Sequence, residues 1–138
     1  MSCVFCQLVL ERSGSLVVFE NEHTLGFLDH KPLFPGHCLL IPKVHYETLP
    51  DLPAALVGPL FTAVQKLGRA IETGMEAEGT FVAINNRVSQ SVPHLHVHIV
   101  PRRKKDGLKG FFWPRRPYES PEAAAAAQKA IVRTLETL

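Results

Sequence analysis

Three histidines, His94, His96 and His98, stand at alternate positions within five residues of the chain. Successive side chains of a β-strand point to opposite faces, so this spacing predicts that the three imidazoles share one face. The intervening Leu95 and Val97 then lie on the other face, where aliphatic side chains pack. Neutral imidazole is a nucleophile toward phosphorus and the commonest metal ligand, so the histidine face suits either chemistry.

Two cysteines near the amino terminus, Cys3 and Cys6, form a second group with chemical potential. Their C-x-x-C spacing lets two thiolates reach one metal ion, and it is also the spacing of redox-active dithiols. A redox dithiol is expected near a βαβ pattern, which does not follow here, so metal binding is favoured. Cys38 is the third cysteine, and its apolar neighbours predict a small buried side chain in a protein without a disulfide framework.

Hydrophobic periodicity predicts the elements that must position these groups. Residues 16–20 and 24–28 are expected to form a hairpin, and residues 38–41 a third strand. A helix is expected to begin with Asp51 as its N-cap and to end near Gly74. Its apolar residues recur in steps of three and four, which predicts one buried stripe made of Leu56, Leu60, Val64, Leu67 and Ile71.

Two further strands are expected at residues 81–84 and 95–100, paired antiparallel through the polar loop 85–91. Pro101 is expected to end the second of them. The order of strands, helix and strands favours an antiparallel α+β domain over a doubly wound parallel sheet.

The carboxyl end divides into a loop and a helix. Residues 104–118 are rich in Gly, Pro, Arg and aromatic residues and are expected to form a long loop. The aromatic residues of this loop are Phe111, Phe112 and Trp113. They are expected to pack either on the core of the same domain or at a subunit interface. Ser120 as N-cap and Pro121 at the first helical position then predict a C-terminal helix.

Composition bounds the class of protein. The chain has 138 residues, 46% of them hydrophobic, which suffices for one core, so a single domain over residues 1–138 is expected. A formal net charge of +2 argues against a protein that neutralises a nucleic-acid backbone. No stretch approaches the roughly 20 apolar residues of a membrane span, and no secretion signal is recognisable. We therefore expect a cytoplasmic protein with small-molecule partners that binds neither nucleic acid nor membrane.

The histidine run also resembles a known family signature. The sequence His94-Leu-His-Val-His98-Ile-Val, with Gln90-Ser91-Val92 before it and Pro101-Arg102 after it, is similar to the motif of the histidine triad (HIT) family of nucleotide hydrolases and transferases. Three upstream stretches resemble that family in order and spacing: residues 27–32, 35–37 and 40–45.

The resemblance is strongest over residues 3–102 and leaves residues 103–138 as a C-terminal extension, in which residues 107–118 resemble a bacterial subgroup. It implies a HIT-like fold, which is an α+β fold with an antiparallel sheet, one long helix and here a C-terminal helix. It also implies a homodimer.

The resemblance implies two catalytic residues. His96 would attack the α-phosphate of a nucleotide and form a nucleotidyl-histidine, and His98 would donate a hydrogen bond to the phosphate or the leaving group. His94 would bind zinc or donate a hydrogen bond near the phosphate. Substrate-binding roles fall on Asp29, Asn85, Gln90, Ser91 and His98.

Each binding role has a plainer alternative. Asp29, expected to accept from both ribose hydroxyls, is also a residue that caps turns. Asn85 and Gln90 stand in a polar loop and are also typical of solvated turns. This loop is shorter than in the family, and Ser89 stands where many members have glycine, so the chain departs from the family pattern in its phosphate loop.

In metal-binding members of the family the cysteine pair is joined by two histidines, which here are His45 and His94. The resemblance therefore implies a structural zinc held by Cys3, Cys6, His45 and His94. Unliganded terminal cysteines are the alternative.

The function implied is hydrolysis of a nucleoside phosphoramidate or a dinucleoside polyphosphate, with a purine nucleotide as the bound group. A nucleotidyl transferase or phosphorylase is the first alternative, although such members more often carry glutamine at the position of His98. The second is a non-catalytic, nucleotide-binding zinc protein, against which the complete triad argues.

Overall fold

The computed structural model describes residues 3–12, 14–109 and 115–138. The chain divides into two compact units, Met1–Asp106 and Gly107–Leu138. This boundary falls inside the C-terminal extension, so every predicted site residue belongs to the first unit. Within the described part of the chain, no helix has both the length and the apolar character needed to cross a bilayer.

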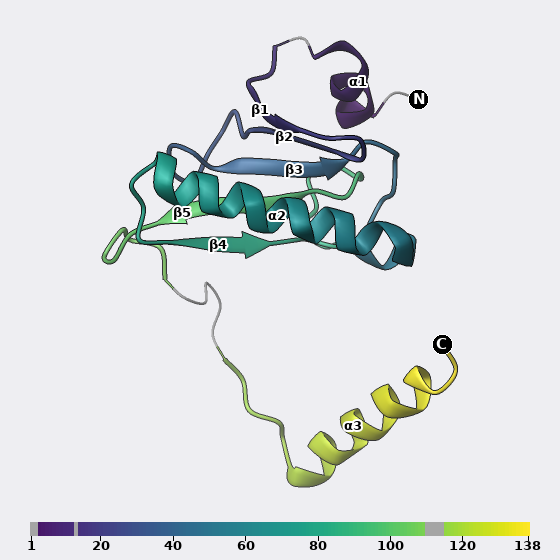
Figure 1. The fold of residues 1–138 in the computed structure, drawn as a ribbon. Helices are drawn as coiled ribbons and strands as arrows, with labels where there is room; N and C mark the ends of the chain where they lie inside the picture. The colour runs from purple at the N-terminus through teal and green to yellow at the C-terminus, as the bar shows by residue number, and fades with distance from the viewer. Residues whose placement is uncertain (1–2, 13, 110–114) are drawn as a thin grey trace. The chain divides into compact units, whose positions relative to one another are not determined.

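A five-stranded sheet forms the centre of the first unit (Figure 1). Its order is β1-β2-β3-β5-β4, and every neighbouring pair is antiparallel, which confirms the α+β class. The strands are β1 (Val17–Glu20), β2 (Thr24–Leu28), β3 (Cys38–Pro42), β4 (Gly79–Ala83) and β5 (Val97–Arg102). Strands β3 and β5 are distant in sequence, yet they pair with Leu39 opposite His98.

Strand β5 begins and ends two residues later than predicted. Beyond Ile99 it pairs with β4 alone, so at Pro101 it is locally an edge strand, where proline is tolerated. The expectation that Pro101 ends the strand is therefore wrong, because β5 continues to Arg102.

Helix α2 (Ala54–Gly74) lies across one face of the sheet and contacts β2, β3, β4 and β5 (Figure 1). The predicted apolar stripe is confirmed, since Leu60, Val64, Leu67 and Ile71 are buried and Leu56 packs at the edge of the same core. The helix ends at Gly74, as expected.

Asp51 is not the N-cap of this helix, which corrects the prediction. Its carboxylate accepts hydrogen bonds from the Thr48 backbone N–H at 3.2 Å and from the Thr48 hydroxyl at 2.6 Å. These bonds close the short 3-10 helix η1 (Leu49–Asp51), and Pro53 takes the N-cap position of α2. The two prolines in this stretch favour a separate turn before the helix.

Helix α1 (Val4–Glu11) is an element that the sequence patterns do not predict. Eight residues form too short a helix to be stable alone, so its position depends on packing. Phe5 supplies that packing, because it is buried among apolar side chains on the face of the sheet opposite α2: Leu25, Phe27, Leu39 and Ile41. The helix therefore carries Cys3 and Cys6 to this face.

The second unit contains helix α3 (Pro121–Leu135). Its predicted start is confirmed, because the Ser120 hydroxyl accepts a hydrogen bond from the Ala123 N–H at 3.0 Å and Pro121 is the first helical residue. Phe111, Phe112 and Trp113 lie outside the described residues.

Candidate functional site

The histidine segment alternates between two environments. The aliphatic residues are fully buried in the core that faces α2: Leu95, Val97 and Ile99. His94 and His96 are buried on the other side, where both rings pack edge-on against Phe5 with centroids 5.8 and 5.2 Å away. His98 lies within β5, and the other two histidines lie in the segment that leads into it, where His94 is at a bend.

His96 is held in one tautomer. Its Nδ1–H donates a hydrogen bond of 2.8 Å to the backbone carbonyl of His94, so the lone pair of the neutral ring resides on Nε2. The ring stands 5.0 Å from that of His98, centroid to centroid. A nucleophilic nitrogen thus lies next to a second imidazole.

A third residue, His37, fixes the tautomer of His98. The backbone N–H of Leu33 donates to His37 Nδ1 at 3.0 Å, so the proton of the neutral His37 ring is on Nε2. His37 Nε2 lies 3.0 Å from His98 Nδ1 and therefore donates to it. His98 then carries its own proton on Nε2, where it is free to donate to a bound phosphate.

Burial keeps these rings neutral. It lowers the pKa of His98 to about 4, with further lowering by the neighbouring His96 and His37 and a small opposing effect of Asp29. Burial also lowers the pKa of His37, again opposed by the charge of Asp29. At neutral pH the pair therefore works through hydrogen bonds between neutral rings.

Asp29 lies beside His37 at the end of β2. Its Oδ1 accepts a hydrogen bond from the Lys31 N–H at 2.9 Å, so the predicted alternative of a turn cap describes part of its role. Its Oδ2 lies 3.6 Å from His37 Nε2. Asp29, His37 and His98 are close enough to hold a metal. However, the hydrogen bond from Leu33 to His37 Nδ1 leaves a proton on His37 Nε2, so this nitrogen faces His98 as a donor and has no lone pair for a metal. The hydrogen-bond relay therefore runs from Leu33 through His37 to His98, and the Asp29 carboxylate lies beside it.

The four predicted metal ligands converge at one point. The ligand atoms of Cys3, Cys6, His45 and His94 all lie within 4.8 Å of one another. His94 Nδ1 is 3.4 Å from Cys3 Sγ and 3.6 Å from Cys6 Sγ, and His45 Nδ1 is 3.4 Å from Cys6 Sγ. Ligands around a tetrahedral zinc, with bonds of about 2.3 Å to sulfur and 2.0–2.1 Å to nitrogen, are separated by about 3.6 Å. The four residues therefore fit zinc.

His94 is oriented for ligation by the backbone. Its Nε2–H donates to the carbonyl of Pro42 at 2.9 Å, so its lone pair faces the cysteines from Nδ1. Burial lowers the pKa of His94, which keeps the ring neutral and able to bind a cation. Burial, together with the neighbouring Cys3, raises the pKa of the Cys6 thiol and so favours its protonated form. A bound cation would instead favour the thiolate.

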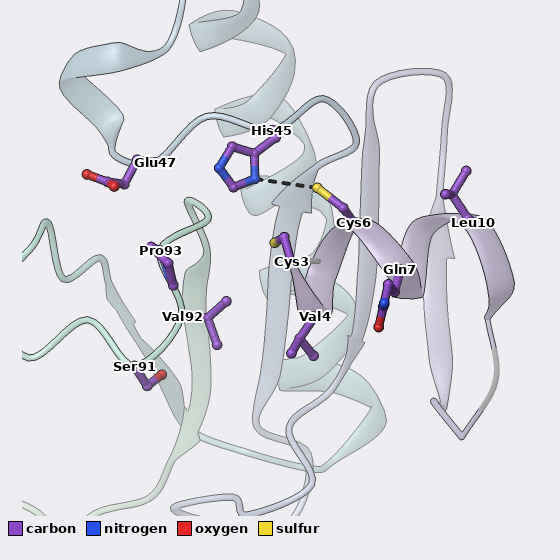
Figure 2. A pocket seen from close by; sticks show the side chains of 10 residues that line it. All are labelled: Cys3, Val4, Cys6, Gln7, Leu10, His45, Glu47, Ser91, Val92 and Pro93. Atoms are coloured by element: carbon purple, nitrogen blue, oxygen red, sulfur yellow. Dashed lines mark hydrogen bonds between the residues drawn. The ribbon is translucent and has the colours of Figure 1, made fainter. Parts of the chain in front are cut away.

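A cavity of about 640 Å³ opens beside this cluster. Cys3, Cys6 and His45 are among its lining residues, and Figure 2 shows the Cys6 sulfur directed toward the His45 ring. Val4, Gln7 and Leu10 of α1 line one side of the cavity. The other side comes from Glu47 after β3 and from Ser91, Val92 and Pro93 before the triad, which places the predicted residue Ser91 there.

The loop that follows β4 differs in detail from the prediction. Asn85 and Ser91 are exposed near its two ends. Gln90 instead acts as a clamp, because its side-chain oxygen accepts from the Arg87 N–H at 2.8 Å and its amide donates to the Glu47 carbonyl at 2.7 Å. Gln90 thus fastens the loop to the segment after β3.

Two residues at the site were not predicted as functional. His37 lies in a stretch that resembles the family, but only the β3–β5 pairing brings it to His98. Phe5 stands between the two cysteines in the sequence, and its contact with His96 depends on helix α1. No local pattern distinguishes either from an ordinary buried residue.

Comparison with known proteins places this arrangement in a family. The family model of the HIT domain matches residues 11–105. An uncharacterized HIT-like protein of Saccharolobus solfataricus is 34% identical over 99% of both chains. The asymmetrical bis(5'-nucleosyl)-tetraphosphatase of Schizosaccharomyces pombe is 39% identical over 67% of this chain and 52% of its own. The adenosine 5'-monophosphoramidase of Candida albicans is 32% identical over 82% of this chain and 78% of its own.

Solved structures agree with the fold. A HIT family member from Bacillus subtilis has a TM-score of 0.85 and 34% identity, covering 96% of each chain. A zinc-bound histidine triad family protein from Mycobacterium smegmatis has a TM-score of 0.74 and 35% identity, covering 100% of this chain and 99% of its own.

Proposed function

Since the chain belongs to the histidine triad (HIT) family, we propose that it is a hydrolase that cleaves a nucleoside phosphoramidate or a dinucleoside polyphosphate at the α-phosphate. The observation that carries this proposal is the tautomer of His96, whose Nδ1–H is engaged by the His94 carbonyl while Nε2 keeps its lone pair. A neutral imidazole nitrogen held in this way is a nucleophile toward phosphorus. The relatives named as a tetraphosphatase and a phosphoramidase support this choice of substrates.

The reaction divides into two displacements. The Nε2 lone pair of His96 attacks the α-phosphorus, and the bond from phosphorus to the leaving nitrogen or oxygen breaks with its electron pair. Water then attacks the nucleotidyl-histidine, and the phosphorus–nitrogen bond breaks so that the lone pair returns to His96. Over the cycle, the proton that the water loses balances the one that the leaving group takes up. Two easier steps replace one difficult step because imidazole both attacks and leaves well.

His98 assists both steps as a hydrogen-bond donor. The relay from Leu33 through His37 leaves the His98 proton on Nε2, and the low pKa keeps the ring neutral. A donor fixed toward the reacting phosphate stabilises the negative charge that develops there.

The remaining predicted residues bind substrate in this proposal. Oδ1 of Asp29 accepts the hydrogen bond from the Lys31 N–H. Its other carboxylate oxygen, Oδ2, accepts hydrogen bonds from the ribose hydroxyls. Asn85 and Ser91 are exposed donors for the phosphates. Gln90 contributes by holding their loop in place.

A structural zinc at Cys3, Cys6, His45 and His94 belongs to the same proposal. Four protein ligands close a tetrahedral site and leave no open position for substrate, so bound zinc would supply a cross-link between α1 and the triad segment. The zinc-bound relative supports this assignment.

We further propose a homodimeric, cytoplasmic enzyme with a purine nucleotide as the bound group. Strand β4 is an edge strand with the exposed apolar residue Val82, which offers a pairing surface to a second copy. Light scattering of the purified protein tests the dimer. A transferase or phosphorylase would differ only in using phosphate in place of water, and product analysis with and without phosphate separates the two.

The central experiment replaces His96. We expect His96→Ala to lose several orders of magnitude of turnover on adenosine and guanosine phosphoramidates and dinucleoside polyphosphates while still binding AMP. The wild-type protein, denatured without acid during turnover, should carry labelled nucleotide on His96. His23→Ala, at an exposed turn, serves as the control. Label on another residue, or substantial turnover by His96→Ala, would contradict the mechanism, and absence of any nucleotidyl transfer would favour a binding protein.

A further inference from the structure

The cysteine pair has properties that a purely structural metal site does not require. Cys3 is the N-cap of α1 and Cys6 lies in its first turn, so both sulfurs project from the same end of the helix. Both cysteines are partly exposed and line the cavity of about 640 Å³. The cavity gives a small oxidant direct access to the two sulfurs (Figure 2).

The third cysteine, Cys38, differs from this pair in its burial. Cys38 is 2% exposed, and burial raises its pKa to about 11. A thiol that oxidants cannot reach reacts slowly with them. Oxidation is therefore directed to Cys3 and Cys6.

The same short helix supports the nucleophile. Phe5 stands between the two cysteines and packs edge-on against both His94 and His96. The His94 ring faces the sulfurs, and its backbone carbonyl accepts the hydrogen bond from His96 Nδ1. The cysteine cluster and the His96 tautomer are therefore joined by two short paths, one through Phe5 and one through His94.

We propose that Cys3 and Cys6 form a reversible oxidation site through which a hydroperoxide switches the activity of His96. With hydrogen peroxide, one thiol sulfur attacks a peroxide oxygen, the O–O bond breaks, and a sulfenic acid and water form. The second thiol sulfur then displaces the hydroxyl group, which leaves as a second water, and a disulfide remains. Two thiols are oxidised and one peroxide is reduced. The effect on activity rests on the proposed function.

A disulfide is incompatible with the metal geometry. Its sulfurs are about 2 Å apart, whereas two sulfurs on one tetrahedral zinc are about 3.8 Å apart. Oxidation therefore releases any bound metal and removes the partners of His45 and His94. Helix α1 then depends on the packing of Phe5 and its apolar neighbours alone, and the His96 ring loses part of its support.

The first measurement follows the thiols and the metal. The reduced, zinc-loaded full chain is titrated with hydrogen peroxide, and thiols are counted by alkylation and mass spectrometry. We expect Cys3 and Cys6 to be lost together while Cys38 stays reduced. A chromogenic chelator should detect zinc release in step with thiol loss, and dithiothreitol with zinc should reverse both. Oxidation of Cys38 at the same rate would overturn the assignment of the site.

The second measurement reads His96 without relying on turnover. Nitrogen-15 NMR of the imidazoles reports which ring nitrogen carries the proton. We expect His96 to be protonated on Nδ1 in the reduced protein and to exchange between tautomers after oxidation. Identical His96 signals in both forms would overturn the coupling, and this result would stand even if the protein had no hydrolase activity.

Variants separate oxidation from loss of packing. Cys3→Ser should make both the His96 signals and the nucleotidylation rate insensitive to peroxide. Phe5→Leu should keep its thiols but reproduce the oxidised His96 signals, with a rate lower by on the order of tenfold to a hundredfold, as expected for a misplaced reacting group. Phe19→Leu removes an aromatic ring from the α2 side and is the matched control. Wild-type behaviour of Phe5→Leu would contradict the path through Phe5.

Discussion

Nε2 of His37 lies 3.0 Å from Nδ1 of His98, although 61 residues separate the two histidines in the sequence. The contact exists because β3 and β5 are neighbours in the sheet, with Leu39 opposite His98. The Leu33 N–H gives this contact a direction, from His37 as donor to His98 as acceptor.

Loss of His37 should impair catalysis without removing the nucleophile. We expect His37→Ala to lower kcat/KM by about tenfold to a hundredfold, because His98 Nδ1 loses the donor that keeps its proton on Nε2 and a hydrogen bond to a charged group is worth roughly 1.5–3 kcal/mol. His37→Gln, whose amide can donate to His98 Nδ1, should recover part of the loss. Steady-state kinetics and a thermal unfolding curve for each variant provide the check. Unchanged kcat/KM in His37→Ala would show that His98 needs no relay.

The stability of the protein should fall in mild acid. The pKa of His98 is about 4 in the folded chain and about 6.5 in an unfolded chain, so between these values the unfolded state binds more protons. The contribution of His98 to the free energy of unfolding is therefore fully present above pH 6.5 and is lost as the pH falls toward 4. His98 alone should contribute a loss of about 3 kcal/mol over this range. Denaturant unfolding at a series of pH values should show a weaker dependence in His98→Gln than in wild type.

Asp29 should contribute to the affinity for the ribose of the nucleotide more than to the rate of the chemical step. We expect Asp29→Ala to weaken binding of AMP much more than binding of the 2',3'-dideoxy analogue, because only the former offers hydroxyl donors to Oδ2. Asp29→Asn, which keeps an oxygen for the Lys31 N–H, controls for the turn. Calorimetric titration gives both affinities. Equal losses for the two ligands would assign Asp29 to the turn alone.

The zinc assignment predicts a stoichiometry and a stability effect. Purified protein should contain close to one zinc per chain, and chelation should lower its melting temperature, since metal binding free energy is folding free energy in such sites. Cys6→Ser should lose the metal, whereas Cys38→Ser should retain it because that thiol lies outside the cluster. Metal analysis and thermal unfolding test both. A fully stable and active metal-free protein would contradict the assignment.

Ser89 adopts a left-handed backbone conformation with φ 62°. Glycine reaches this region without steric cost, so we expect Ser89→Gly to stabilise the protein by about 0.5–1 kcal/mol. Ser89→Ala keeps the Cβ and should give no such gain. Denaturant unfolding measures both. Destabilisation by Ser89→Gly would mean that the Ser89 hydroxyl contributes more than the backbone strain costs.

The sequence by itself determined the local patterns. Alternation of histidine with Leu95 and Val97 defines two faces because side chains of an extended chain alternate. The apolar stripe of α2 follows from helical periodicity in the same way, and the C-x-x-C spacing brings two sulfurs to one side of a turn. These features depend on neighbours within a few residues.

Only the tertiary structure decided which faces meet. The pairing of His37 with His98 requires β3 beside β5, and no local pattern specifies this order of strands distant in sequence. Helix α1 is too short for a periodic signal, so the contact of Phe5 with His96 arises from burial among β2 and β3. Gln90 became a loop clamp because Glu47 lies within its reach. Long-range contacts of this kind are chosen by the free energy of the whole core, which no short stretch of sequence carries.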